Sequence, residues 1–300
     1  MKRSLKIAAL GLAALAVLLA LAVFGAGLYA DKKRERKVEV EVAALPYASG
    51  EAVLARGRYL FASRGCVDCH GANGAGRAFI EDPNGLYVKG PNITGGSGGV
   101  VAAYTERDWV RAIRHGVKPD GRPLLIMPSE DYNRFTDADL AALVAYTRAL
   151  PAQPGEGAVL RLPALVKTLY AVGVIKDAAE KIDHKLPPAQ PVAEGATAQH
   201  GAYVANMCIG CHGATLSGGK IPGGPPDWPA AANLTPGAGS IMPLYDTPEK
   251  FRAMMRGGKR PDGSAVKVMP FESLKEMNDT DLAALYAYLK TVPAKEAGKR

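Results

Sequence analysis

Cysteine and aromatic residues are scarce in this sequence, and its excess of positive charge lies at the ends of the chain. Only 4 of 300 residues are Cys, and Phe, Trp and Tyr together make up 7%. Residues 1–50 hold eight Lys or Arg against four Asp or Glu, whereas residues 51–151 hold twelve against eleven and residues 193–293 hold nine against nine. A nucleic-acid-binding surface needs Lys and Arg clustered on the folded part of a protein. The charge distribution therefore argues against a nucleic-acid partner, and the few aromatic side chains leave room in the core for a prosthetic group.

Convincing strand alternation is also absent, and the regular segments have helical periodicity instead. Residues 51–63 and 198–207 are short amphipathic runs that lead into the cysteines. Later helices carry recognisable start signals, namely the expected N-caps Thr105, Thr136 and Asn278 and a proline at a first helical position, Pro248. The segments between them are rich in Gly and Pro. The pattern predicts an all-α fold whose loops wrap a prosthetic group.

The N-terminus holds a long apolar run. Residues 7–30 carry no charged side chain, and as a helix they span roughly 36 Å, enough to cross a bilayer core. A cleaved signal peptide is the alternative, because the run contains a small-x-small site at Ala20 and Ala22. Since the apolar run continues past that site, the sequence predicts a retained transmembrane anchor over residues 1–30 and a charged spacer over residues 31–50.

Two segments of the chain repeat each other at a nearly constant offset. The residues matched at an offset of 142 are Cys66, Cys69 and His70 with Cys208, Cys211 and His212, Met127-Pro128 with Met269-Pro270, and DLAALVAY (139–146) with DLAALYAY (281–288). The offset drifts to 141 where Asn92-Ile93-Thr94 matches Asn233-Leu234-Thr235. Two copies of one unit predict tandem domains. The expected division is a first domain at 51–151, a linker at 152–192, a second domain at 193–293 and a tail at 294–300.

The linker is long, and residues 159–175 within it are strongly apolar. A long connection in a compact protein usually has structure of its own. We therefore expect this segment to lie across the junction of the two domains, and the alternative is a surface that binds a partner or the membrane.

Each repeat uses its two cysteines in the pattern C-x-x-C-H, for which three chemistries compete. A redox C-x-x-C is typical of a βαβ context, which this sequence lacks. A zinc site with four cysteine ligands would use both pairs, but it assigns no role to His70, His212 or the repeated methionines. Covalent haem uses all of these residues, because the two thiols add to the vinyl groups and the adjacent histidine becomes an axial ligand of the iron. We therefore predict two c-type haems, attached at Cys66, Cys69, Cys208 and Cys211.

Methionines are the predicted second axial ligands. Met127 is the only methionine after the cysteines in the first repeat, and Met269 is its counterpart in the second. Methionine–histidine ligation is one of the known ligand sets of c-type haem. The predicted iron ligands are therefore His70 with Met127 and His212 with Met269.

Other histidines and methionines are weaker candidates for the same position. His115 is not repeated, and we expect it to be exposed at the end of a helix, where a cation is favoured. Met242 precedes a proline but has no methionine counterpart in the first repeat. Met254 and Met255 lie on an expected helix, so packing in the core is the better interpretation.

With these motifs, the sequence resembles the class I cytochromes c over both repeats, about 200 of its 300 residues. The marks are C-x-x-C-H near the start, GPNIT at residues 90–94, a later Met-Pro and a closing amphipathic helix. The resemblance implies that the carbonyl of Pro91 accepts a hydrogen bond from His70, which orients the ring and raises its basicity. Ala232 stands in the second repeat where Pro91 stands in the first, so we expect a less rigid loop there and unequal potentials of the two haems.

The overall layout is similar to the membrane-anchored multihaem cytochrome subunits of bacterial dehydrogenases. Those subunits commonly carry three haem motifs, whereas this chain has two. The resemblance implies a single-pass protein of the bacterial inner membrane with both haem domains in the periplasm, since such haems are attached on the outer side. It also implies redox partner proteins in or at that membrane and membership of a membrane complex.

Two classes of function fit these expectations. An electron carrier passes single electrons between a membrane-associated donor and a periplasmic or oxidase acceptor, and methionine–histidine ligation suits it because both axial positions are closed. A dihaem peroxidase is the alternative, and it needs an open or displaceable iron ligand beside an acid–base group. The spare histidines are His115, His184 and His200, and none of them is repeated. The sequence therefore favours the carrier, with no catalytic residue of its own.

Overall fold

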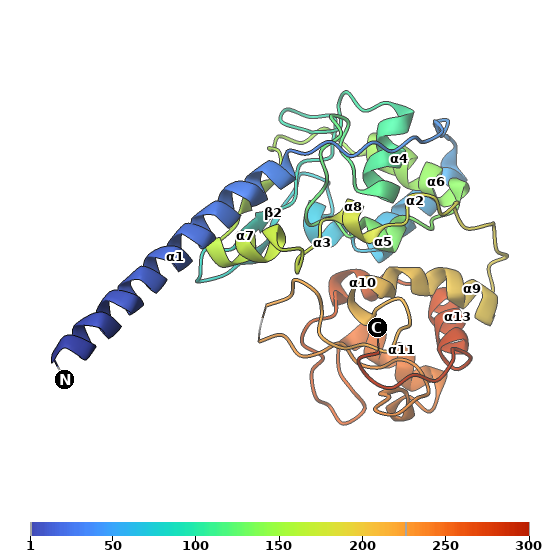
Figure 1. The fold of residues 1–300 in the computed structure, drawn as a ribbon. Coiled ribbons are helices and arrows are strands. Elements are labelled where there is room, and N and C mark those ends of the chain that lie inside the picture. The colour runs from blue at the N-terminus through green and yellow to red at the C-terminus, as the bar shows by residue number, and fades with distance from the viewer. Residues whose placement is uncertain (1, 226, 300) are drawn as a thin grey trace.

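The computed structural model describes residues 2–225 and 227–299, in which one extended helix leads into a body of two helical domains (Figure 1). This helix, α1 (Lys2–Arg34), projects from the body at its N-terminal end. By length and composition it is the one helix of the described residues that could cross a membrane, with a mean hydropathy of 2.8 over its most apolar 18 residues. A signal sequence near an N-terminus has the same properties.

The first domain follows an extended stretch, and its helices are α2 (Glu51–Ser63), α3 (Cys66–His70), α4 (Glu106–His115), α5 (Ser129–Tyr132) and α6 (Asp137–Ala149). α2 and α6 pack closely on each other. Gly57 makes this approach possible, because a Cβ there would lie 2.0 Å from the carbonyl oxygen of Ala142. The expected N-caps are confirmed, since the hydroxyls of Thr105 and Thr136 accept hydrogen bonds from the third backbone N–H of α4 and α6.

The second domain repeats this plan with α9 (Ala198–Val204), η1 (Ala205–Cys208), α10 (Ile209–His212), η2 (Met242–Leu244), α11 (Pro248–Gly257), α12 (Phe271–Leu274) and α13 (Asp279–Leu289). α9 packs on α13 as α2 packs on α6. Gly201 permits that contact, because a Cβ there would lie 1.9 Å from the carbonyl oxygen of Ala284. Asn278 caps α13, and Pro248 opens α11, as predicted.

The structure is mostly helical, as predicted, and a small sheet is present beside the helices. The sheet consists of β1 (Ala78–Glu81), β2 (Tyr87–Lys89) and β3 (Val159–Arg161), paired antiparallel in that order. Strands of three or four residues are too short for an alternating pattern to stand out in a sequence. The third strand comes from the linker, so the sheet ties the linker to the first domain.

The apolar part of the linker does not lie where the sequence suggested. α7 (Ala164–Ala171) packs along the C-terminal end of α1 instead of filling the junction between the domains (Figure 1). Tyr170 and Ala30 are both fully buried there, together with Leu125. Further along, α8 (Ala178–Lys181) contacts α5. The linker therefore joins α1 to the first domain, with Tyr170 of α7 buried against Ala30 of α1.

The two domains meet through short helices that are equivalent in the repeat. α3 of the first domain contacts α12 of the second, and α10 of the second contacts α5 of the first. Both of these contacts pair the helix that carries C-x-x-C-H with the helix that follows Met-Pro in the other domain. The domains are thus packed on each other with a near-twofold relationship.

Candidate functional site

The first C-x-x-C-H motif forms α3, and its histidine is held by the loop that contains Pro91. Nδ1 of His70 lies 3.0 Å from the carbonyl oxygen of Pro91. A carbonyl can only accept, so Nδ1 carries the proton and the lone pair of the neutral ring lies on Nε2. Burial also lowers the pKa of His70, which favours the neutral, metal-binding imidazole. The contact is the one that the resemblance implies.

Close backbone contacts hold this loop against the motif, and they require glycine. A Cβ on Gly90 would lie 2.1 Å from the carbonyl oxygen of Cys69, and a Cβ on Gly76 would lie 2.3 Å from the carbonyl oxygen of Gly90. The backbone N–H of Gly76 donates to the carbonyl of His70, with an N···O distance of 2.8 Å. The loop that carries Pro91 therefore lies directly on the histidine and its cysteine neighbour.

The second motif has the same geometry despite its different loop sequence. Nδ1 of His212 lies 2.8 Å from the carbonyl oxygen of Ala232, which takes the place of Pro91. The backbone N–H of Gly218 donates to the carbonyl of His212 at 2.9 Å, matching the contact of Gly76 in the first domain. Because the acceptor is a backbone carbonyl, an alanine supplies it as well as a proline does.

Two paired polar residues brace each of these loops, and sequence reasoning did not assign them a role. Asn92 and Thr94 are fully buried, and the Asn92 Oδ1 accepts from the backbone N–H of Thr94 at 2.9 Å. The amide nitrogen of Asn92 donates to the carbonyl of Gln153 at 2.8 Å, which ties the loop to the segment after α6. Asn233 and Thr235 make the matching bonds in the second domain. The shared N-x-T triplet was the signal for them.

A methionine and a cysteine pack against the same core in each domain. Cys66 and Met127 both pack on the first core, and Cys208 and Met269 both pack on the second. The two Met-Pro turns also match, since Met127 and Met269 each accept a hydrogen bond at 2.9 Å from the backbone N–H two residues on. Each domain therefore places one cysteine of its motif and the methionine of its Met-Pro pair on one apolar core, and these residues fit a covalently attached haem.

The thiols fit neither a redox C-x-x-C nor a zinc site. Cys66, Cys69 and Cys208 form no disulfide. Burial raises the pKa of Cys66, Cys69 and Cys208 to about 12, whereas a redox C-x-x-C depends on a lowered thiol pKa. Over residues 2–225 and 227–299, no three side chains of His, Cys, Asp or Glu gather into a group that could hold a metal ion. The two cysteine pairs are thus not brought together as a zinc site requires.

The rival histidines and methionines have structural partners. Met254 and Met255 lie in the second core, as predicted, and Met242 is buried with them. His115 corrects the expectation of an exposed cation, because it is half-buried and its Nδ1 lies 3.1 Å from Nδ1 of His184. Burial and the neighbouring His184 lower the pKa of His115 to about 4, so it is neutral at pH 7.

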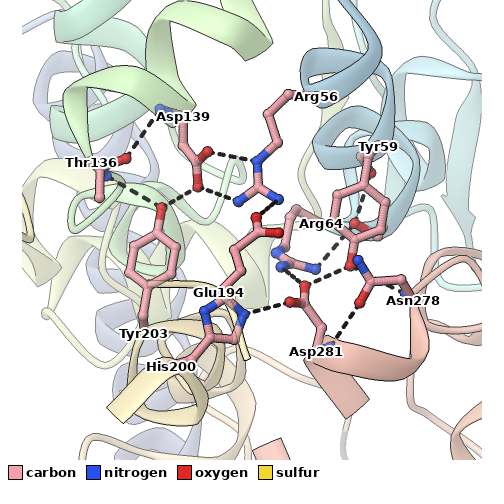
Figure 2. Close-up of polar contacts among 11 residues, drawn as sticks. Arg56, Tyr59, Arg64, Thr136, Asp139, Glu194, His200, Tyr203, Asn278 and Asp281 are labelled. Carbon is pink, nitrogen blue, oxygen red and sulfur yellow. Dashed lines mark hydrogen bonds and ion pairs between the residues drawn. The ribbon is translucent and has the colours of Figure 1, made fainter. Parts of the chain in front are cut away.

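Buried polar contacts join the two domains, and Figure 2 shows them. Asp281 at the start of α13 binds Arg64 and Tyr59 of the first domain and, at 2.6 Å, His200 of its own domain. Asp139, its counterpart at the start of α6, accepts from the hydroxyl of Tyr203 of the second domain at 2.6 Å. Each carboxylate therefore lies in the first turn of its own helix and accepts a hydrogen bond from a tyrosine of the other domain.

The Arg64–Asp281 pair is the most buried contact of this network that joins the two domains. Asp281 is 1% exposed and Arg64 is 4% exposed. Burial alone would raise the pKa of Asp281, but the charge of Arg64 and the bonds from His200 and Tyr59 outweigh it and lower that pKa to about 2. Asp281 is therefore ionised at neutral pH, and the two domains share a buried ion pair.

Family comparisons agree with the two repeats. Residues 52–146 match the family described as "Cytochrome C oxidase, cbb3-type, subunit III", and residues 198–293 match the family described as "Cytochrome c". The matched segments contain both C-x-x-C-H motifs and both Met-Pro pairs.

Comparisons with individual proteins extend over most of the chain. The fructose dehydrogenase cytochrome subunit of Gluconobacter japonicus is 29% identical over 281 residues, which cover 85% of this chain and 56% of that protein. The gluconate 2-dehydrogenase cytochrome c subunit of Pantoea cypripedii is 28% identical over 284 residues, which cover 84% of this chain and 62% of that protein. The cytochrome c subunit of alcohol dehydrogenase (quinone) from Gluconobacter oxydans (strain 621H) is 32% identical over 101 residues. The chain thus spans less than two thirds of the length of these relatives. It carries two cytochrome c domains, each of which takes one haem c, and it is homologous to the cytochrome subunits of dehydrogenases.

Proposed function

We propose that this protein is a membrane-anchored electron-transfer subunit of a dehydrogenase or respiratory complex. In this proposal α1 anchors the chain in the bacterial inner membrane, and the domains at 51–151 and 193–293 lie in the periplasm. The relatives named above are cytochrome subunits of dehydrogenases, which supports a dehydrogenase subunit as the electron donor. The acceptor is a periplasmic or oxidase protein.

We assign the haem-binding residues from the matched geometry of the two domains. Thioether bonds form at Cys66 and Cys69 and at Cys208 and Cys211, and the axial ligands are His70 with Met127 and His212 with Met269. When bound, each haem supplies reversible one-electron chemistry at its iron. The chain's own contribution is to hold each histidine through the carbonyl of Pro91 or Ala232 and to keep the iron ligands inside an apolar core.

One observation carries the proposal of transfer within the protein. The motif helix of each domain contacts the Met-Pro helix of the other, so both attachment sites lie at the surface that the domains share. The buried Arg64–Asp281 pair crosses this surface and opposes separation of the domains. A fixed short separation between the two sites favours electron exchange inside one molecule over exchange between molecules.

A dihaem peroxidase is less well supported. Such an enzyme needs an acid–base group beside an iron with a displaceable ligand. Two of the spare histidines face each other, His115 and His184, and the third, His200, bonds to Asp281. The curated relatives are also named as cytochrome subunits, a role of electron transfer.

Rapid reduction with a sub-stoichiometric one-electron donor tests the proposal. We expect electrons to redistribute between the two haems at a rate that is independent of protein concentration. Redistribution that occurs only as a bimolecular, concentration-dependent process would show that the two domains act as separate carriers. Rapid binding of carbon monoxide to one reduced haem would instead support the peroxidase.

A further inference from the structure

The linker helix α7 lies beside α1 at the level where the uncharged run 7–30 ends. Nζ of Lys33 donates to the carbonyl of Tyr170 at 3.1 Å, and Nζ of Lys167 lies 2.7 Å from a carboxylate oxygen of Asp31. Tyr170 also packs on Ala30 in a small buried cluster. These contacts hold α7 at a fixed height along α1, and Figure 1 shows the two helices side by side.

The outer side of this linker segment is unusually apolar for an exposed surface. Among the described residues outside α1, three large apolar side chains are more than 60% exposed, and all three lie here: Leu165 at 66%, Val172 at 66% and Val174 at 61%. On α1 the neighbouring Leu28 and Tyr29 are also more than half exposed. Exposed apolar side chains gathered on one short segment mark a contact with another apolar phase or molecule.

The level of residues 164–176 along α1 indicates which surroundings cover their apolar side chains. If α1 crosses the bilayer over residues 7–30, the level of Ala30 is the boundary between acyl chains and headgroups. Apolar side chains next to tyrosine and exposed lysines are typical of segments that lie in this boundary, and Tyr29, Lys32 and Lys176 are exposed here. The second domain packs on α3 and α5 and approaches Ile175 through Gly223, but it leaves Leu165, Val172 and Val174 exposed.

We propose that residues 164–176 lie in the membrane interface, with Leu165, Val172 and Val174 in contact with phospholipid acyl chains. This inference rests on the proposed membrane anchoring by α1. The segment is tied to the first domain through β3 and through the contact of α8 with α5, and the bidentate pair of Arg36 with Asp177 ties it to the stretch after α1. Its insertion therefore adds a second point of attachment, which fixes the tilt of the haem domains above the bilayer instead of leaving them to swing on a single helix.

Photolabelling from the acyl chain tests this position directly. The full-length holoprotein is placed in phospholipid nanodiscs that contain a lipid with a diazirine in its acyl chain, and trypsin fragments are analysed by mass spectrometry. Cleavage after Lys6, Lys32, Arg161, Lys167 and Lys176 separates the fragments 7–32, 162–167 and 168–176. We expect label in all three fragments, and we expect Val174→Asp to lower the label in 168–176 severalfold without changing 7–32. Leu244→Asp, at an apolar residue of the second domain that is 45% exposed, is the matched control and should change neither.

The labelling pattern distinguishes the insertion of residues 164–176 from the membrane anchoring by α1. Label in 7–32 alone would overturn the inference and leave the anchor intact. Absence of residues 1–30 from the purified protein, or no label in 7–32, would overturn the membrane anchoring itself. Loss of label from 168–176 in the native complex, but not in the isolated subunit, would assign this surface to a partner protein and also overturn the inference.

Discussion

The hydroxyl of Ser273 donates to the carboxylate of Asp68 at 2.7 Å, across the boundary between the two domains. The near-twofold counterpart of this contact joins Asp131 to the backbone N–H of Gly210 at 2.8 Å. Asp131 stands 142 residues before Ser273, and Gly210 stands 142 residues after Asp68. The carboxylate belongs to the motif helix α3 in the first contact and to α5, which follows Met-Pro, in the second. Each contact therefore keeps one acceptor and one donor. A duplicated unit can pack on its own copy in this way without repeating the residues that make the interface.

The buried ion pair is expected to dominate the strength of this interface. Arg64→Ala leaves Asp281 buried without its main cationic partner, which typically costs about 3–5 kcal/mol. Urea unfolding followed by circular dichroism measures the loss of stability. The matched control is Asp279→Asn, which removes an exposed carboxylate two residues away on the same helix and should cost much less than Arg64→Ala. Equal losses in the two variants would contradict the assignment.

Lowering the pH should reduce the free energy of unfolding through the protonation of Asp281. The folded state lowers the pKa of this group from 3.8 to about 2, so the unfolded chain binds its proton more readily. The resulting stabilisation is fully present above pH 3.8 and is lost as the pH falls toward 2, an amount of about 2–3 kcal/mol. Unfolding free energies measured between pH 5 and pH 2 should fall more steeply in the wild type than in Asp281→Asn. Identical slopes would show that this carboxylate does not have a lowered pKa.

The glycine next to Pro91 should tolerate no side chain. A Cβ at Gly90 would lie 2.1 Å from a backbone oxygen, so Gly90→Ala must displace the loop that bonds to His70. Overpacking of this kind typically costs about 1–3 kcal/mol, and the displaced loop should also shift the reduction potential of the first haem. Gly95→Ala is the control, since no atom lies within 4 Å of its added Cβ and its φ is not positive. A wild-type potential in Gly90→Ala would argue against the role of this loop.

The proposed methionine ligands give a spectroscopic prediction. The oxidised protein should show the weak near-infrared band of methionine–iron ligation at the intensity of two haems, and Met127→Ala should halve it. Met254→Ala is the matched control, because this methionine is buried in the second core and belongs to no proposed ligand set. An unchanged band in Met127→Ala would show that another residue binds the first iron.

The sequence alone determined the features that depend on neighbouring residues. The C-x-x-C-H motifs, the Met-Pro pairs and the repeat itself are read directly from residue identities. The capped helices beginning after Thr105, Thr136 and Asn278 could also be predicted, because a cap is a contact between residues three apart.

Only the tertiary structure decided how these parts meet. The pairing of Arg64 with Asp281 joins residues 217 apart, and the counterpart of Arg64 in the second repeat is Asn206, so the repeat contained no hint of it. The linker was equally ambiguous, since an apolar run predicts burial against something but does not identify the surface. The burial of Tyr170 against Ala30 and the strand pairing of β3 decided that surface, and the first of these contacts joins residues more than 100 positions apart in the chain.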